Sequence, residues 1–181
     1  LFILIIDQSG SMYNSIKNVS NTLSKLIESF PQDSYYQLIG FGTNFRKYDS
    51  KPKINSEENI NNLKKIINSL AADMGGTNLS LPLKDILKDS YKDYKDFNLS
   101  KQIIILTDGD INLGEETTEL INLHNNEFKI HLIGIGSGVN SNTIISTSKA
   151  GNGSYCFIDD TSDLKKVIFE LLNKCTNEYI N

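Results

Sequence analysis

Two runs of apolar residues, each followed at once by an acidic turn, constrain the fold of this chain more than any other feature. Leu1–Ile6 holds six apolar residues before Asp7, and Gln102–Leu106 is apolar after its first residue and precedes Thr107-Asp108. A strand that is apolar on both faces must be covered on both sides, as in a parallel sheet between helices. Both runs are far shorter than the roughly 20 residues of a membrane span. We therefore expect two central, buried strands.

Strands and helices alternate along the rest of the chain. Apolar residues that recur at steps of three and four indicate amphipathic helices, and short apolar runs indicate strands. This alternation predicts an α/β fold, with a doubly wound, mostly parallel sheet that carries helices on both faces. Helices are expected over residues 16–30, 56–70, 79–94, 115–125, 141–149 and 162–174, and further strands over 35–41, 45–48, 129–135 and 154–158.

The length of the chain, 181 residues, fits a single domain. An apolar start without an initiator methionine indicates that residues 1–181 are an excerpt of a larger, multidomain protein. The formal net charge of −4 argues against binding to nucleic acid through bulk charge. No apolar run is long enough for insertion into a membrane. We expect one domain that engages neither nucleic acid nor a bilayer.

The cysteine content bears on the compartment. Cys156 and Cys175 are predicted to be free thiols, with a bridge between them as the alternative. So few cysteines favour a cytoplasmic location, because disulfide-rich domains are typical of oxidising compartments. A secreted or cell-surface location is the alternative.

Three polar turns are predicted to meet at one edge of the sheet. Asp7–Ser11 and Thr107–Asp110 each follow a central strand, and ligands bind at the carboxyl ends of the strands in sheets of this kind. Gly75–Leu79 opens a helix, and we expect it to bring Thr77 to the same edge. Together the turns offer two carboxylates and three hydroxyls without His or Cys. Such ligands suit Mg²⁺ or Mn²⁺, with Ca²⁺ as a further alternative, whereas zinc would prefer imidazole or thiolate.

The charges of these ligands predict how the site would act. Asp7 and Asp108 would neutralise a divalent cation, whereas neutral hydroxyls leave the ion a strong electrophile. Five protein groups leave octahedral coordination incomplete, so the vacant position would attract a carboxylate from outside the chain. Glycines in these turns allow the backbone to approach closely. They are Gly10, Gly75, Gly76 and Gly109.

These motifs resemble the metal-ion-dependent adhesion site of von Willebrand factor type A domains. The resemblance lies in Asp7-x-Ser9-x-Ser11, in Thr77 after a glycine pair and in Asp108 of Thr-Asp-Gly, and the order of strands and helices is similar throughout the chain. It implies that Ser9, Ser11 and Thr77 are hydroxyl ligands, and that Asp7 and Asp108 act directly or through water. It also implies that a Glu or Asp of a partner protein completes the coordination.

The resemblance further implies the arrangement of a six-stranded sheet. Numbered along the chain, the strands would lie in the order 3-2-1-4-5-6, with residues 45–48 as a short antiparallel edge strand. Gly-Gly-Thr-Asn-Leu, Ile-Gly-Ile-Gly-Ser-Gly-Val-Asn and Gly-Asn-Gly-Ser-Tyr look closer to the inter-alpha-trypsin-inhibitor heavy chain and vault poly(ADP-ribose) polymerase group than to integrins. We therefore expect a metal-dependent protein-binding or adhesion module without catalysis of its own.

Two other functions stand beside this hypothesis. The domain could be a scaffold in a larger assembly, with a metal site that is structural or unused. It could also be an Mg²⁺-dependent phosphohydrolase, since acidic strand ends with Mg²⁺ also serve phosphoryl transfer. Catalysis is the less favoured, because the Asp-x-Asp of haloacid dehalogenase-type enzymes is here Asp7-x-Ser9, and the chain has neither a Walker nor a Gly-x-Ser-x-Gly motif.

Several polar residues also have a purely structural interpretation. Asp and Ser before a helix are ordinary N-caps, and this is the alternative for Asp7–Ser11. Asp110 is expected to be a solvated loop residue rather than a ligand. His124 and His131 fall outside the predicted site loops, so we expect them to be structural or exposed.

Overall fold

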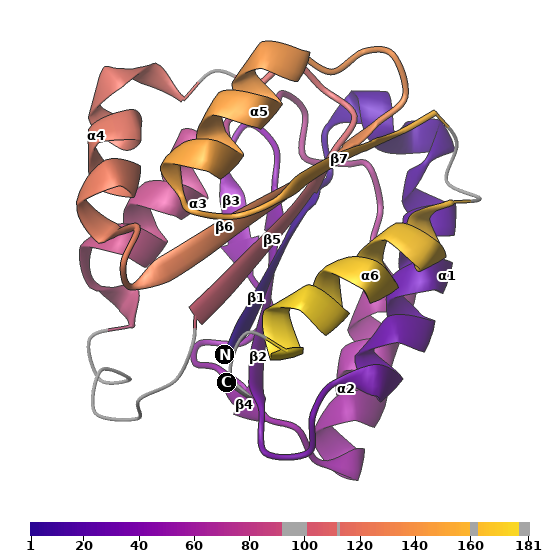
Figure 1. Cartoon of the computed structure of the whole chain (residues 1–181). Helices are drawn as coiled ribbons and strands as arrows, with labels where there is room; N and C mark the ends of the chain where they lie inside the picture. Colours follow the sequence, from indigo (N-terminus) through magenta and orange to yellow (C-terminus); the bar gives the residue numbers. More distant parts are fainter. Residues whose placement is uncertain (92–100, 112, 160–162, 178–181) are drawn as a thin grey trace.

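The two apolar runs form neighbouring strands at the centre of one sheet, as the computed structural model shows (Figure 1). β1 (Phe2–Asp7) and β5 (Lys101–Thr107) pair in parallel, and the register places Ile3 opposite Ile103. Every residue of both strands is buried. The structure describes residues 1–91, 101–111, 113–159 and 163–177. The prediction of two central, buried strands is confirmed.

Other strands extend the sheet on either side of this pair. On one side β1 pairs with β2 (Tyr35–Phe41), which pairs antiparallel with the short edge strand β3 (Phe45–Lys47). On the other side β5 pairs with β6 (Phe128–Ile135), and β6 pairs with β7 (Tyr155–Ile158). The order β3-β2-β1-β5-β6-β7 confirms the predicted strand order and the antiparallel edge.

A seventh strand corrects the prediction of a six-stranded sheet. β4 (Lys53–Ile54) pairs antiparallel with the start of β2, where Tyr36 lies opposite Lys53. β3 and β4 therefore share one edge of β2, and residues 48–52 connect them. The sequence pattern missed β4 because both of its residues are exposed and show no apolar alternation. Pro52, directly before them, also lacks the backbone N–H of a strand residue.

Helices cover both faces of the sheet, and shorter turns of 3-10 and π-helix adjoin them (Figure 1). In the part of the chain that the structure describes, the α-helices are α1 (Ile16–Leu26), α2 (Glu57–Asn68), α3 (Ser80–Asp85), α4 (Gly114–His124), α5 (Ser141–Ala150) and α6 (Leu164–Asn177). The shorter turns are η1 (Gly10–Asn14), η2 (Ile27–Ser29) and η3 (Ile86–Ser90).

Two predicted helices are divided in the structure. The helix expected over residues 16–30 is α-helical only as far as Leu26 and continues as the 3-10 turn η2. The helix expected over residues 79–94 changes from α3 to the π-helix η3 at Ile86, and residues 92–94 lie outside the described part. Pro82 is accommodated in the first turn of α3, where its missing N–H leaves no intrahelical bond unmade.

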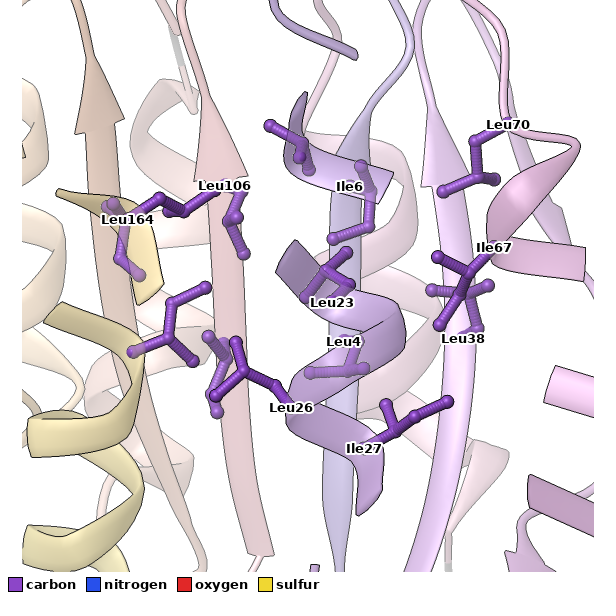
Figure 2. Packing of buried hydrophobic residues seen from close by; sticks show 14 of the residues in the cluster. Leu4, Ile6, Leu23, Leu26, Ile27, Leu38, Ile67, Leu70, Leu106 and Leu164 are labelled. Carbon is purple, nitrogen blue, oxygen red and sulfur yellow. The ribbon is translucent and has the colours of Figure 1, made fainter. Parts of the chain in front are cut away.

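The side chains of the central strand point alternately into two cores. Leu4 and Ile6 belong to a cluster that includes residues of α1, α2 and α6, and Figure 2 shows Leu23 of α1 packed over them. Ile3 and Ile5 belong to a second cluster, with residues of α3, α4 and α5. This division explains why β1 is apolar at every position from Phe2 to Ile6, and it confirms the prediction of helices on both faces.

His131 has a structural role, which confirms one of the two expectations for it. It lies on β6, is 4% exposed, and its Nε2 donates to Gln102 Oε1 at 2.7 Å while Nδ1 accepts the Ser154 N–H at 3.0 Å. Because Nδ1 accepts, the ring is the neutral tautomer protonated at Nε2. The imidazole therefore ties β5 and the start of β7 to β6.

The predictions about the cysteines and about membrane insertion can be compared only with the residues that the structure describes. Cys156 of β7 is a half-buried free thiol in this structure, but the side chain of Cys175 lies outside those described, so the absence of a bridge stays a prediction. Among the helices that the structure describes, none is both long enough and apolar enough to span a bilayer.

A matched pair of leucine truncations tests the assignment of the first core. Leu23→Ala removes a side chain that is 1% exposed, and it is expected to lower the free energy of unfolding by about 2–5 kcal/mol. Leu123→Ala on α4, where the side chain is 75% exposed, is expected to change it by no more than about 0.5 kcal/mol. Urea unfolding of both variants measures the difference, and equal losses would contradict the burial described above.

Candidate metal centre

The three polar turns converge at the carboxyl edge of the sheet. Asp7 is the last residue of β1, and Asp108 follows Thr107, the last residue of β5. The pairing of these two strands therefore places both carboxylates at one edge. The third turn joins them through two backbone hydrogen bonds, in which Gly10 N–H donates to the Gly75 carbonyl at 2.9 Å and Met74 N–H donates to the Gln8 carbonyl at 2.9 Å.

Asp7 is fully buried, and its carboxylate is held on both oxygens. Oδ1 accepts the Ser9 N–H at 2.8 Å, and Oδ2 accepts the hydroxyl of Thr107. Thr107 in turn accepts the Gly109 N–H at 3.2 Å. Thr107 is thus a positioning residue whose role was not predicted, although it belongs to the Thr-Asp-Gly motif, because its partner Asp7 lies 100 positions away in the chain.

The two serines link the first turn to the second carboxylate. Ser9 Oγ lies 3.0 Å from Ser11 Oγ, and Ser11 Oγ donates to Asp108 Oδ1 at 2.5 Å. Ser9 occupies the N-cap position of η1, but its side chain makes no capping hydrogen bond. The N-cap interpretation of this turn therefore does not account for the Ser9 hydroxyl, which faces Ser11 instead.

Thr77 reaches the same place from the third turn. A Cβ built on Gly109 would lie 3.1 Å from Thr77 Oγ1, so the threonine hydroxyl lies against the loop that carries Asp108. Gly75, two residues earlier, has φ +79°, a conformation that favours glycine and turns the chain toward this edge. The structure therefore brings together all five residues that the sequence singled out.

Gln8 lies between the ligands Asp7 and Ser9, and its side chain holds the first turn in place. This role was not predicted, because position 8 is unspecified in the motif Asp-x-Ser-x-Ser. It is 1% exposed, its Nε2 donates to the Ala71 carbonyl at 2.8 Å, and its Oε1 accepts the Tyr48 hydroxyl at 2.8 Å. A Cβ at Gly40 would lie only 1.8 Å from Gln8 Oε1, so a larger residue there would displace the Gln8 amide. This amide fixes the first turn to two neighbouring loops.

The electrostatics of the centre favour a cation. Burial raises the pKa of Asp7 above its ordinary value of 3.8, and the negative charge of Asp108 raises it further, while hydrogen bonds from Ser9 and Thr107 oppose the rise. Within the described ranges, no Lys, Arg or His forms an ion pair with either carboxylate. Two adjacent carboxylates and three hydroxyls without a cationic side chain fit a divalent ion.

The other polar candidates lie apart from these contacts. Asp110 is exposed, in agreement with its expectation as a solvated loop residue. His124 ends α4, where Nδ1 lies 3.5 Å from Glu127 Oε2. No three His, Cys, Asp or Glu side chains converge in the described part of the chain, so the donors of the centre are hydroxyls and two carboxylates only.

Comparisons with known proteins agree on one family. Residues 2–157 match the von Willebrand factor type A domain. A von Willebrand factor A domain-containing protein of Dictyostelium discoideum is 31% identical over 173 residues, which cover 95% of this chain and 18% of that protein. The mouse von Willebrand factor A domain-containing protein 5B1 is 27% identical over 99% of this chain and 15% of its own length. The chain thus spans less than a fifth of these two relatives.

Solved structures share the fold. A von Willebrand factor type A protein from Catenulispora acidiphila has a TM-score of 0.83 at 21% identity, covering 96% of this chain and 42% of that one. Proximal thread matrix protein 1 from the mussel byssus, in a structure described as having a zinc-occupied metal-ion-dependent adhesion site, has a TM-score of 0.77 at 20% identity. That match covers 96% of this chain and 47% of the byssus protein.

The raised pKa of Asp7 predicts a characteristic pH dependence. Because the folded state holds the proton more tightly than the unfolded state, the contribution of Asp7 to stability is complete below 3.8 and is lost as the pH rises through the folded-state pKa. With EDTA at neutral pH, Asp7→Asn is therefore expected to melt at a higher temperature than the wild type. The difference in melting temperature between the two proteins should vanish below pH 3.8.

The exposed Asp110→Asn is the matched control for this experiment, since it removes the same charge three positions beyond the end of β5. Its melting temperature is expected to follow that of the wild type at every pH. A wild type that is as stable as Asp7→Asn at neutral pH in EDTA would contradict the electrostatic cost assigned to Asp7.

Proposed function

This chain belongs to the von Willebrand factor type A family, whose domains are modules for protein interaction, and on that premise we propose that it captures a partner protein through a bound divalent cation. The observation that carries the proposal is the convergence of two carboxylates and three hydroxyls with no cationic side chain paired to the carboxylates in the described residues. The partner would supply the remaining ligand as a Glu or Asp side chain.

The proposed ligands are the five residues at the carboxyl edge. Ser9, Ser11 and Thr77 would bind through their hydroxyls, and Asp7 and Asp108 directly or through water. These hard oxygen donors favour Mg²⁺, with Mn²⁺ or Ca²⁺ as alternatives. The zinc in the byssus protein shows that its site, on the same fold, can take a different divalent ion.

The chain's own groups would prepare the site for this ion. The Ser9 N–H and the Thr107 hydroxyl hold the Asp7 carboxylate in one orientation, so little order is lost when the ion binds. The Ser11 hydroxyl, which donates to Asp108 in this structure, would turn its lone pair toward the cation. The bound ion supplies positive charge and a coordination position for the partner's carboxylate.

We propose no catalytic activity for the domain. The contacts of the five site residues include no His, Cys or Lys among the described residues, so neither serine hydroxyl is paired with a His or Lys base that would activate it as a nucleophile. Relatives at 25–32% identity include von Willebrand factor A domain-containing proteins of Dictyostelium and the 5A and 5B1 proteins of rat and mouse. The closer likeness to the inter-alpha-trypsin-inhibitor group stays a prediction.

We further propose that the domain is one part of a larger protein. It matches 15–20% of the length of its relatives, which supports a multidomain parent. In such a protein the neighbouring domains would set the compartment and the choice of partner, while this domain would supply the metal-dependent contact.

Calorimetric titration with Mg²⁺ tests the metal site. The wild type is expected to bind the ion, and Asp7→Ala is expected to abolish the heat, because the removed carboxylate neutralises the ion and anchors Ser9. Asp110→Ala, which removes an exposed carboxylate from the adjoining loop, should bind as the wild type does. Equal weak heats from all three proteins would reject the site.

A chelation experiment separates capture through metal from a scaffolding role. Once a partner is isolated, its binding to the immobilised domain is expected to fall at least tenfold in EDTA and to return with excess Mg²⁺. Replacement of the partner's critical acidic residue by its amide should have the same effect as EDTA. Binding that survives both changes would favour the scaffold, in which the metal is structural or unused.

A further inference from the structure

The turn between β2 and β3 is hydrogen-bonded to the loop that carries Thr77. The Gly42 carbonyl accepts the Asn78 N–H at 2.7 Å, and the Thr43 N–H donates to the Met74 carbonyl at 2.7 Å. Met74 precedes Thr77 in the chain and Asn78 follows it, so the turn holds the loop on both sides of the candidate ligand. No motif of the candidate centre includes this turn.

The hydroxyl of Thr43 adds a third bond to the same loop. Its Oγ1 accepts the Gly76 N–H at 2.9 Å, and Gly76 directly precedes Thr77. A Cβ built on Gly75 would lie only 2.7 Å from the same oxygen, so the loop passes directly against the Thr43 side chain. Thr43 therefore fixes the backbone at the residue next to the Thr77 hydroxyl.

The hairpin of β2 and β3 is also bound to the helix that follows this loop. Lys47 of β3 pairs with Asp85 of α3 at 2.5 Å, and both side chains are partly shielded from solvent. α3 begins at Ser80, three residues beyond Thr77. The hairpin thus contacts the chain before and after the third part of the candidate centre.

Thr77 depends on such contacts more than the other candidate ligands do. The other four lie at the ends of β1 and β5 or in the turns that follow them, where strand pairing fixes the backbone. Thr77 lies in the connection between α2 and α3, in which residues 69–79 belong to no strand or helix. Gly75 and Gly76 add conformational freedom to this connection. The position of the Thr77 hydroxyl is therefore set by contacts from other loops.

We propose that Thr43 is a positioning residue of the metal centre, which holds the Gly76 backbone so that the Thr77 hydroxyl is presented to the cation in one place. This proposal rests on the function proposed above, because it concerns the same ion. Mg²⁺ demands near-ideal octahedral geometry, whereas the larger Ca²⁺ accepts irregular coordination. A fixed Thr77 hydroxyl therefore favours Mg²⁺ over Ca²⁺, and Thr43 contributes to this selectivity.

Calorimetric titration with Mg²⁺ and, separately, with Ca²⁺ tests the proposal. Thr43→Val removes the acceptor and keeps the shape of the side chain. It is expected to weaken Mg²⁺ binding about three- to tenfold, as the loss of one hydrogen bond implies, and Ca²⁺ binding by a smaller factor. Thr43→Ser, which keeps the hydroxyl, is expected to bind both ions as the wild type does.

Thr118→Val is the matched control, because it makes the same change at an exposed, hydrogen-bonded threonine of α4. It is expected to bind both ions as the wild type does. If Thr43→Val binds Mg²⁺ as tightly as the wild type, or weakens both ions equally, the positioning role is overturned and the proposed function stands. A wild type that binds neither ion would overturn both.

Amide hydrogen exchange in EDTA provides a readout that does not depend on the ion. The Gly76 amide is expected to be protected in the wild type and in Thr43→Ser, and to exchange about three- to tenfold faster in Thr43→Val. The Asn78 amide, which bonds to the Gly42 carbonyl, should keep its protection in all three proteins. Unchanged exchange at Gly76, or equal loss of protection at Gly76 and Asn78, would contradict a specific role of the hydroxyl.

Discussion

The hydrogen bond from Thr107 to Asp7 is the contact on which the candidate centre depends. It joins the ends of β5 and β1, two residues that are 100 positions apart in the chain. A buried carboxylate is tolerated only when it is hydrogen-bonded, and here both of its oxygens have partners. The hydroxyls of Ser9 and Ser11 are then placed relative to this carboxylate, as is Asp108 through Ser11.

The loops around this carboxylate are held together by hydrogen bonds between the loops themselves, in addition to the pairing of the strands that they follow. Gly10 bonds to the carbonyl of Gly75, and the side chain of Gln8 joins Ala71 to Tyr48. Two of these bonds join the first turn to the loop between α2 and α3, and the third joins it to Tyr48, so ligands that come from separate parts of the sequence are held at one edge. Such preorganisation keeps the entropic cost of binding an ion low.

The unneutralised negative charge of the centre follows from the same arrangement. Asp7 is ionised only at a cost, because it is buried and Asp108 carries a charge of the same sign nearby. Among the described residues no Lys, Arg or His forms an ion pair with either carboxylate. A divalent ion would remove this cost, which is the physical reason for proposing one there.

The sequence by itself predicted the fold class and the five candidate residues of the centre, because apolar runs and turn motifs are local patterns, whereas the strand order followed from the resemblance to von Willebrand factor type A domains. It did not predict β4, which is two exposed residues, or the roles of Thr107 and Gln8, whose partners lie far away in the chain. These features depend on strand register and helix packing, which bring distant residues into contact and which only the tertiary structure decides.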